Sequence, residues 1–283
     1  MQTKIFPKIS IVTPSFNQAE FLEDTILSIL SQDYPNLEYI IIDGGSRDDS
    51  VDIIKKYARK LAYWVSEPDK GRGDAINKGF ARSSGEIMSW LGCGDMYFPW
   101  TFDLMREIFV TFPEIEWLAS HAICIWATKY LPHIYGDVRG YAKSGFFDGR
   151  NLSGRTSIQQ ESVFWRCSLW QRAGGYVDEN LAGMPDFELW LRFWQQGQLY
   201  TLSAPLGGIR AHDSQQKFFK EHSRATRNML NNFYKNNYWK KCLHEFRYSI
   251  SKIKVLKRIV ASYAFQVSYD LDTEKWFVEK ILI

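Results

Sequence analysis

The sequence predicts an α/β protein with a mainly parallel sheet flanked by helices and a helical tail at the C-terminus. Short apolar runs rich in β-branched residues alternate with amphipathic helical segments, and the connections between them are short. This alternation is typical of a parallel sheet covered by helices. The chain has 283 residues, 45% of them hydrophobic, which is enough for a large domain core.

The first 96 residues show the alternation most clearly. Residues 8–14 are predicted to form a buried strand, followed by a helix that Asn17 and Glu20 begin as a capping box. Strands are also expected at 37–42, 62–66 and 87–91, with helices through 51–58 and 74–83 between them. Ligands bind at the carboxyl ends of the strands in such sheets. Three of the four ends carry acidic residues, so the crevice suits a metal-chelated diphosphate better than a free phosphate.

The chain after residue 97 is less regular. Glycine-rich and aromatic stretches up to about residue 160 predict loops and mixed strands over the crevice, and residues 187–195 predict a Trp-rich amphipathic helix. The chain contains 11 Trp, 15 Tyr and 19 Phe. These rings either form a rich core or in part line a carbohydrate-binding or lipid-facing groove.

Charge divides the chain into an acidic body and a basic tail. Residues 1–216 carry 21 Lys+Arg and 26 Asp+Glu, a net charge of −5, whereas residues 217–283 carry 14 and 6, a net of +8. Apolar residues at helical spacing predict a basic amphipathic helix in the tail: Ile250, Ile253, Leu256, Val260, Tyr263 and Val267. Such a helix lies either on an anionic membrane surface or against the main domain with its lysines solvated. No nucleic-acid-binding module is recognisable, so no nucleic-acid partner is expected.

Several common site types are excluded. Gly71-Arg72-Gly73 lacks the third glycine of a dinucleotide-binding loop and follows the third strand, and neither a P-loop nor HExxH occurs. Four widely spaced cysteines without a CxxC pair or a secretory leader predict reduced thiols and a cytoplasmic protein. No apolar stretch reaches the roughly 18 to 20 residues that span a bilayer.

An ordered set of motifs resembles the inverting family 2 glycosyltransferases. Each motif alone is weak, but together they occur in order across about residues 8–213 at family-like spacing. They are residues 10–18 (SIVTPSFNQ), 41–48 (IIDGGSRD), 67–71 (EPDKG), 74–79 (DAINKG), 84–86 (SGE), 95–99 (DMYFP), 160–165 (QESVFW), 173–176 (AGGY) and 186–192 (DFELWLR).

The resemblance implies a GT-A fold, which is Rossmann-like, and an inverting transferase. The donor would be a nucleotide-diphosphate sugar, with a UDP-sugar favoured. The acceptor would be a saccharide, expected to be lipid-linked, in the synthesis of a cell-surface polysaccharide or lipopolysaccharide. The protein would then work in the cytoplasm at the inner face of the cell membrane, with peripheral membrane contact through residues 217–283.

The resemblance assigns the donor site to residues of the first half. Asp43 would accept a hydrogen bond from the nucleobase imide, although Asp-Gly is also ordinary chemistry for a strand-end turn. Asp69 would support the base or ribose. Asp74 is either a donor-site residue or a helix cap. The remaining donor-site candidates are Pro14, Ser15, Asn17, Gly94 and Asp95.

Asp95 stands where the family has its metal-binding acidic motif. A divalent ion there, Mn or Mg, would stabilise the departing diphosphate. This sequence departs from the pattern, because Gly92, Cys93 and Gly94 replace the additional acids. His212 would complete the metal shell or contact the diphosphate, unless it is a structural or surface histidine.

Asp186 is the general base that the resemblance implies. Direct displacement at the anomeric carbon needs a base opposite the leaving diphosphate. Aspartate at a helix start is also a routine cap, and the two roles are compatible. Glu188 is the fallback base. Gln160, Glu161 and Arg192 are expected to border the acceptor, with Arg192 paired to one of the acids.

The expected domains are a glycosyltransferase domain at 1–216, with a nucleotide-binding half at 1–96 and an acceptor half at 97–216, and the tail at 217–283. The thinned acidic motif leaves a second hypothesis, a catalytically impaired protein that binds nucleotide or sugar without turnover. A nucleotidyltransferase is the third hypothesis.

Overall fold

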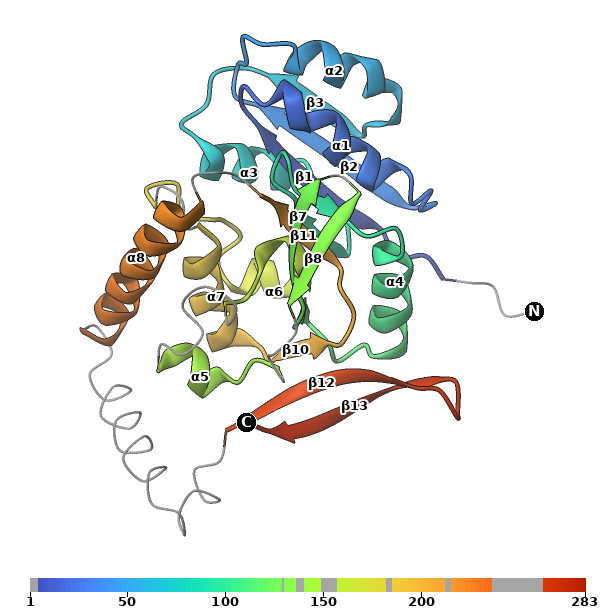
Figure 1. Cartoon of the computed structure of the whole chain (residues 1–283), viewed down its shortest axis with the longest axis vertical. Coiled ribbons are helices and arrows are strands. Elements are labelled where there is room, and N and C mark those ends of the chain that lie inside the picture. Colours follow the sequence, from blue (N-terminus) through green and yellow to red (C-terminus); the bar gives the residue numbers. More distant parts are fainter. Residues whose placement is uncertain are drawn as a thin grey trace.

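A computed structural model describes residues 5–128, 130–135, 140–148, 157–181, 185–211, 215–235 and 262–283, without the side chains of 215–223. Its main sheet has nine strands in the order β13-β12-β10-β6-β9-β4-β1-β2-β3 (Figure 1). These strands are β1 (Ile9–Ser15), β2 (Leu37–Asp43), β3 (Tyr63–Ser66), β4 (Ile87–Trp90), β6 (Trp117–Ser120), β9 (Val163–Arg166), β10 (Leu199–Leu202), β12 (Tyr263–Asp270) and β13 (Lys275–Leu282). A smaller sheet in the order β5-β11-β7-β8 contains β5 (Met96–Tyr97), β7 (Ile123–Thr128), β8 (Leu131–Tyr135) and β11 (Gly207–Arg210).

Helices cover both faces of the main sheet. One face packs against α1 (Ala19–Leu30), α2 (Ser50–Tyr57) and α4 (Thr101–Thr111). The other packs against α3 (Arg72–Phe80), α5 (Lys143–Phe147), α6 (Cys167–Arg172), α7 (Pro185–Gln196) and α8 (Gln215–Lys235). Neighbouring residues of one strand enter opposite cores, as Ile11 and Val12 of β1 do. Burial on both faces explains why these strands are continuous apolar runs.

The parallel half of the sheet confirms the predicted alternation of strands and helices. β1 pairs in parallel with both β2 and β4, and β2 pairs in parallel with β3. The register places Ser15 opposite Asp43 and Asp43 opposite Ser66. The carboxyl ends of three strands therefore meet at one edge, where the sequence predicts the ligand site.

A tryptophan cluster forms much of the core beneath α7. Trp90 and Trp190 stack with their ring centroids 6.0 Å apart, and Trp117 and Trp165 pack against Trp190 at 5.6 and 5.9 Å. All four rings, together with that of Trp194, are fully buried. These five tryptophans thus belong to the core, the first of the two interpretations of the aromatic content.

Two local predictions were wrong. Asn17 does not cap α1: the cap position is Gln18, and the Asp48 carboxylate from the next strand end accepts a hydrogen bond from the Ala19 N–H at 2.9 Å. A long-range acceptor thus does what a capping box would have done locally. The segment after residue 97 also contains the regular helix α4, whose buried face includes Phe102, Met105 and Ile108 at helical spacing.

The expectation of a helical tail needs correction at its end. Tyr263 and Val267 lie in β12, which pairs in parallel with β10 and antiparallel with β13 (Figure 1). A spacing of four residues repeats the same face in a strand as well as in a helix, so it did not distinguish them. Residues 250–261 of the predicted helix lie outside the described residues, and the predicted boundary at 216/217 falls within α8.

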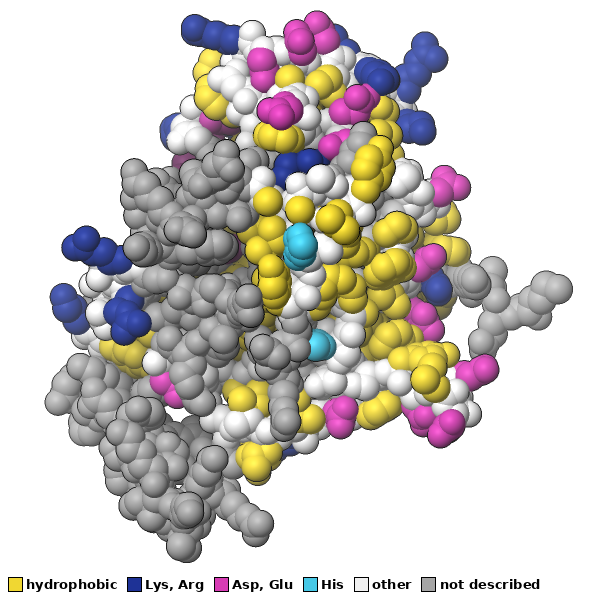
Figure 2. All heavy atoms as spheres, in the orientation of Figure 1, with side chains coloured by type: hydrophobic (Ala, Val, Ile, Leu, Met, Phe, Trp, Pro, Cys, Tyr) yellow, Lys and Arg dark blue, Asp and Glu magenta, His cyan; other side chains and the backbone are white. Residues whose placement is uncertain are grey.

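The described part of the chain contains no helix that is long and apolar enough to cross a membrane. Figure 2 shows many apolar side chains on the face of the molecule that carries β7 and β8. Tyr130, Leu131 and Ile134 of this hairpin are 81%, 56% and 50% exposed. They give the β8 edge of the smaller sheet an apolar surface.

Candidate active site

Asp43 ends β2 with a fully buried carboxylate. It accepts hydrogen bonds from the Gly45 and Ser46 N–H groups at 3.2 and 2.9 Å, from the Ser46 hydroxyl, and from the Ser66 hydroxyl of β3 at 2.6 Å. These bonds fix the turn at the end of β2, so Asp43 has the structural role that the sequence left open as the alternative to nucleobase binding. Contact between Asp43 and a nucleobase stays a prediction.

Asp69 lies directly against this turn. A methyl group on Gly44 would be 2.7 Å from the Asp69 Oδ2, so the absence of a side chain at Gly44 allows the close approach. Asp69 also accepts from the Gly71 N–H at 2.7 Å. Asp74 is not the cap of α3, which is Gly71; it lies inside the first turn, where it accepts from the Lys70 N–H at 3.0 Å and pairs with Lys78 at 3.4 Å. Asp69 thus borders the strand-end crevice, whereas Asp74 binds the backbone just before α3.

Three further candidates for the donor site lie at or just after the end of β1. Pro14 and Ser15 are buried in the strand, and the Ser15 carbonyl accepts from the Gly44 N–H at 2.9 Å. Asn17 is exposed with a positive φ of 50°, and its Oδ1 accepts from the Arg47 N–H at 2.8 Å. The β1 and β2 ends are therefore tied together by short bonds on one side of the crevice.

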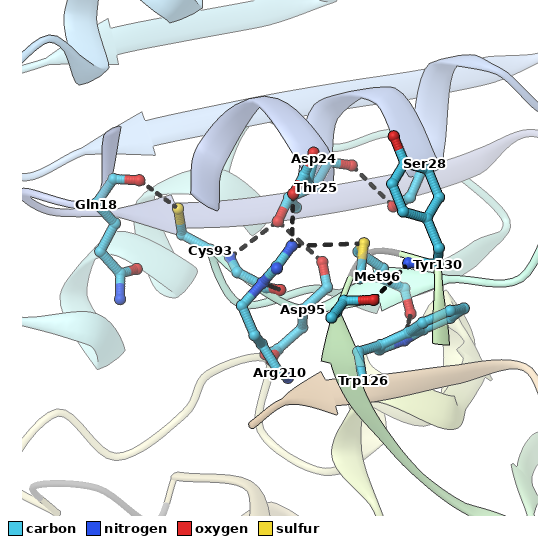
Figure 3. Close-up of polar contacts among 12 residues, drawn as sticks. Gln18, Asp24, Thr25, Ser28, Cys93, Asp95, Met96, Trp126, Tyr130 and Arg210 are labelled. Carbon is cyan, nitrogen blue, oxygen red and sulfur yellow. Dashed lines mark hydrogen bonds and ion pairs between the residues drawn. The ribbon is translucent and has the colours of Figure 1, made fainter. Parts of the chain in front are cut away.

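Asp95 lies in the loop between β4 and β5, which is fixed from two sides (Figure 3). The Gly94 N–H donates to the Thr25 hydroxyl of α1 at 2.8 Å, and this hydroxyl donates to the Asp95 carbonyl at 2.8 Å. The Arg210 guanidinium of β11 donates to the Gly94 carbonyl at 3.1 Å and to the Asp24 carboxylate at 2.7 Å. The backbone N–H of Arg210 donates to the Asp95 Oδ1 at 3.2 Å. Arg210 thus holds this loop in place, a role that the sequence did not predict.

Glu161 is a buried acid beside two others. It lies in the short turn η3 (Gln160–Ser162) and is 7% exposed. Burial, and to a lesser extent the carboxylates of Asp95 and Asp186, raise the pKa of Glu161 to about 8 against the opposing effect of the Arg72 guanidinium. Burial also raises the pKa of Asp95, again against the effect of Arg72. Asp95 and Asp186 thus lie near enough to act on Glu161, and we call these three residues the acidic cluster.

The raised pKa of Glu161 makes stability depend on pH. Between pH 4.5, the ordinary glutamate pKa, and about pH 8 the folded protein keeps a proton on Glu161 that the unfolded chain releases. The free energy of unfolding therefore falls as the pH rises through this range. Glu161→Gln lacks this titration. Urea unfolding of the ligand-free proteins is expected to show similar stabilities at about pH 5 and a more stable variant at about pH 8. A stability difference independent of pH would contradict the placement of Glu161.

Asp186 and Glu188 differ in their surroundings. Asp186 is partly exposed in the first turn of α7 and makes no hydrogen bond or ion pair with the described residues. Glu188 is held by Arg192 through bonds of 2.8 and 2.6 Å, the predicted acid–arginine pair. Arg192 also donates to the Ala173 carbonyl and stacks on the Tyr176 ring at 4.5 Å. The Glu188–Arg192 pair thus supports a loop, which leaves Asp186 as the freer carboxylate.

Gln160 and Arg72 link the two halves of the crevice. The buried Gln160 donates to the Trp90 carbonyl at 2.6 Å and accepts from the Arg72 Nη2 at 3.3 Å. The sequence predicts no role for Arg72, because Gly71-Arg72-Gly73 indicates only that a dinucleotide-binding loop is absent. Its place in the first turn of the helix after an acidic strand end was the available signal.

Comparisons with known proteins identify the family of the chain. Residues 10–105 match the family described as Glycosyl transferase family 2. An uncharacterized glycosyltransferase of Mycobacterium tuberculosis strain H37Rv is 30% identical over 192 residues, which is 65% of this chain and 68% of the relative. One from Rickettsia typhi is 27% identical over 216 residues, 76% and 67% of the two chains. The chain belongs to glycosyltransferase family 2.

Solved structures show that this glycosyltransferase has the GT-A fold. Staphylococcus aureus TarS aligns with a TM-score of 0.56 at 18% identity, over 77% of this chain and 39% of TarS. Its 1–349 fragment in complex with UDP-GlcNAc aligns with a TM-score of 0.55 at 18% identity, over 73% and 59%. The glycosyltransferase chain thus spans about two fifths of the longer TarS chain. The GT-A prediction is confirmed.

The predicted metal pair cannot be assembled from the described side chains of this glycosyltransferase. His212 lies outside the described residues, and within the ranges given above no group of three His, Cys, Asp or Glu side chains could hold a metal ion. Cys93 is buried, and burial together with Asp95 raises the pKa of its thiol, which disfavours a thiolate ligand. A role for Mn or Mg stays a prediction.

Proposed function

We propose that this protein transfers a sugar, with inversion at the anomeric carbon, from a nucleotide-diphosphate donor to a saccharide acceptor. The supporting observation is that Asp95 follows β4 and Glu161 precedes the antiparallel β9 at the same edge of the sheet, with the Arg72 guanidinium against Gly92 beside Asp95 and Asp186 near enough to act on Glu161. The nucleotide would lie along the ends of β1, β2 and β3, near Asp43 and Asp69. The transferred sugar would then lie towards the acidic cluster.

In this proposal Asp186 removes the proton from the acceptor hydroxyl. A carboxylate that is partly exposed and has no other partner among the described residues can accept a proton, whereas Glu188 is engaged by Arg192. The attacking oxygen bonds to the anomeric carbon as the bond to the diphosphate breaks, which inverts the configuration. Glu161 and Gln160 border the acceptor side, and the 1–96 and 97–216 halves are proposed to bind donor and acceptor respectively.

A UDP-sugar is the favoured donor, since the TarS fragment of the same fold was solved with UDP-GlcNAc. A lipid-linked acceptor in polysaccharide or lipopolysaccharide synthesis remains part of the proposal. The exposed apolar side chains of the β7–β8 hairpin offer a surface for its lipid portion (Figure 2). Action at the inner face of the cell membrane, with contact through residues 217–283, is proposed on the resemblance and the basic charge of this segment.

Thermal unfolding in the presence of UDP, GDP and TDP tests the donor assignment. A ligand that binds the native state raises its apparent stability, so one nucleotide is expected to raise the melting temperature more than the others. The comparison is made with Mn and with a chelator. Stabilisation without turnover of the matching sugar donors would favour the impaired binding protein, and equal or absent shifts for all three would contradict the donor site.

A further inference from the structure

Arg72 enters the acidic cluster from the first turn of α3. Its Nη2 donates to the neutral Gln160 Oε1 at 3.3 Å, and the residue is exposed to solvent. A methyl group on Gly92 would lie 3.4 Å from this Nη2 and 2.5 Å from the Asp95 Oδ2. The guanidinium of Arg72 and the carboxylate of Asp95 therefore both lie against Gly92, where any side chain would displace one of them.

The absence of a side chain at Gly92 leaves room for both Arg72 and Asp95. The family resemblance expects additional acids just before Asp95, and their absence suggested a weakened site. The 2.5 Å distance shows that an acidic side chain at Gly92 would collide with Asp95 as it is now placed. A positive group from α3 thus borders the space in which a further carboxylate would have stood.

The charges around the cluster favour an anionic ligand at Arg72. Among the described residues the Arg72 guanidinium makes no ion pair, and its hydrogen-bond partner is the neutral Gln160 amide at 3.3 Å. The Arg210 guanidinium is instead bound to Asp24 and to the Gly94 carbonyl. A guanidinium whose hydrogen-bond partner is a neutral amide keeps donors for a phosphate, which it can bind in a bidentate manner.

We propose that Arg72 binds the diphosphate of the donor and neutralises its charge beside Asp95. This assignment rests on the proposed transferase function, because it presumes that a nucleoside diphosphate occupies the crevice. Arg72 would hold the departing diphosphate without removing a proton from any group.

Calorimetric titration of the full chain tests the assignment. UDP, GDP and TDP are titrated first, and the tightest of them is compared with its monophosphate and nucleoside in Mn and in a chelator. Arg72→Gln is expected to weaken binding of the diphosphate by roughly tenfold to one hundredfold, with little change for the nucleoside. Arg72→Lys should retain part of the affinity. Lys70→Gln is the matched control, because it also removes one positive charge and lies two residues from Arg72. The Lys70 side chain pairs with Glu179 at 3.8 Å.

The outcomes separate this inference from the function on which it rests. If no nucleoside diphosphate binds the wild-type protein, the proposed donor site fails and this inference fails with it. If wild type and Arg72→Gln bind the diphosphate equally, or if Lys70→Gln weakens it as much, the assignment of Arg72 fails alone. An equal loss for nucleoside and diphosphate would show that Arg72 shapes the crevice instead of binding phosphate.

Discussion

Asp186→Asn is expected to lower the rate of sugar transfer by about 10²- to 10⁴-fold, the usual contribution of a general base. The amide has nearly the shape of the carboxylate but cannot take a proton from the acceptor hydroxyl. Asp186 is partly exposed and has no bond to the described residues, so folding and nucleotide affinity should hardly change. Donor turnover and calorimetric binding of the nucleoside diphosphate measure the two quantities separately.

Glu188→Gln supplies the control for Asp186→Asn. Its carboxylate supports Arg192, so the expected effect is a lower melting temperature with less than about a tenfold loss of turnover. The reverse pattern, a large loss for Glu188→Gln and a small one for Asp186→Asn, would make Glu188 the base. Small and equal losses of turnover in both variants would show that neither Asp186 nor Glu188 is the general base.

Trp190→Ala is expected to lower the free energy of unfolding by about 3–5 kcal/mol, a large fraction of the stability of a typical domain. Trp190 is fully buried on α7, where it packs against Trp90, Trp117 and Trp165. The cavity left by the ring would loosen the helix that carries Asp186. The free energy of unfolding, measured in urea, and the rate of donor turnover are therefore expected to fall together.

Trp100→Ala is the matched control for Trp190→Ala. Trp100 is 45% exposed and donates one hydrogen bond from its ring to the Pro205 carbonyl at 2.8 Å. Its removal should cost much less stability than loss of Trp190. Similar losses for the two variants would mean that the tryptophan cluster does not support α7 in the way described.

The alternation of buried strands and amphipathic helices predicted the first half of the fold well. Strand boundaries at Asp43 and Ser66 follow from apolar runs that end in turn residues, because such signals are local. The C-terminal hairpin could not be predicted in this way. Tyr263 and Val267 fit either a helix or a strand, and the pairing of β12 with β10 joins residues more than sixty positions apart.

The sequence names candidate site residues one by one but does not predict their geometry. The motifs placed Asp95, Glu161 and Asp186 in the site, yet nothing in the sequence showed that they would share one electrostatic cluster. The roles of Arg72 and Arg210 depend on side chains that cross from distant elements, to Gln160 in one case and Asp24 in the other. Contacts over such separations appear only once the chain is folded.

Product analysis of a nucleotide-sugar panel tests the central claim most directly. The wild-type protein and Asp186→Asn are incubated with UDP-, GDP- and TDP-sugars and saccharide acceptors, and the released nucleotide and the anomeric configuration of the product are determined. The expected result is release of one nucleoside diphosphate, an inverted glycosidic bond and loss of both in Asp186→Asn. Release of pyrophosphate, or no turnover of any donor by a protein that still binds nucleotide, would contradict the account.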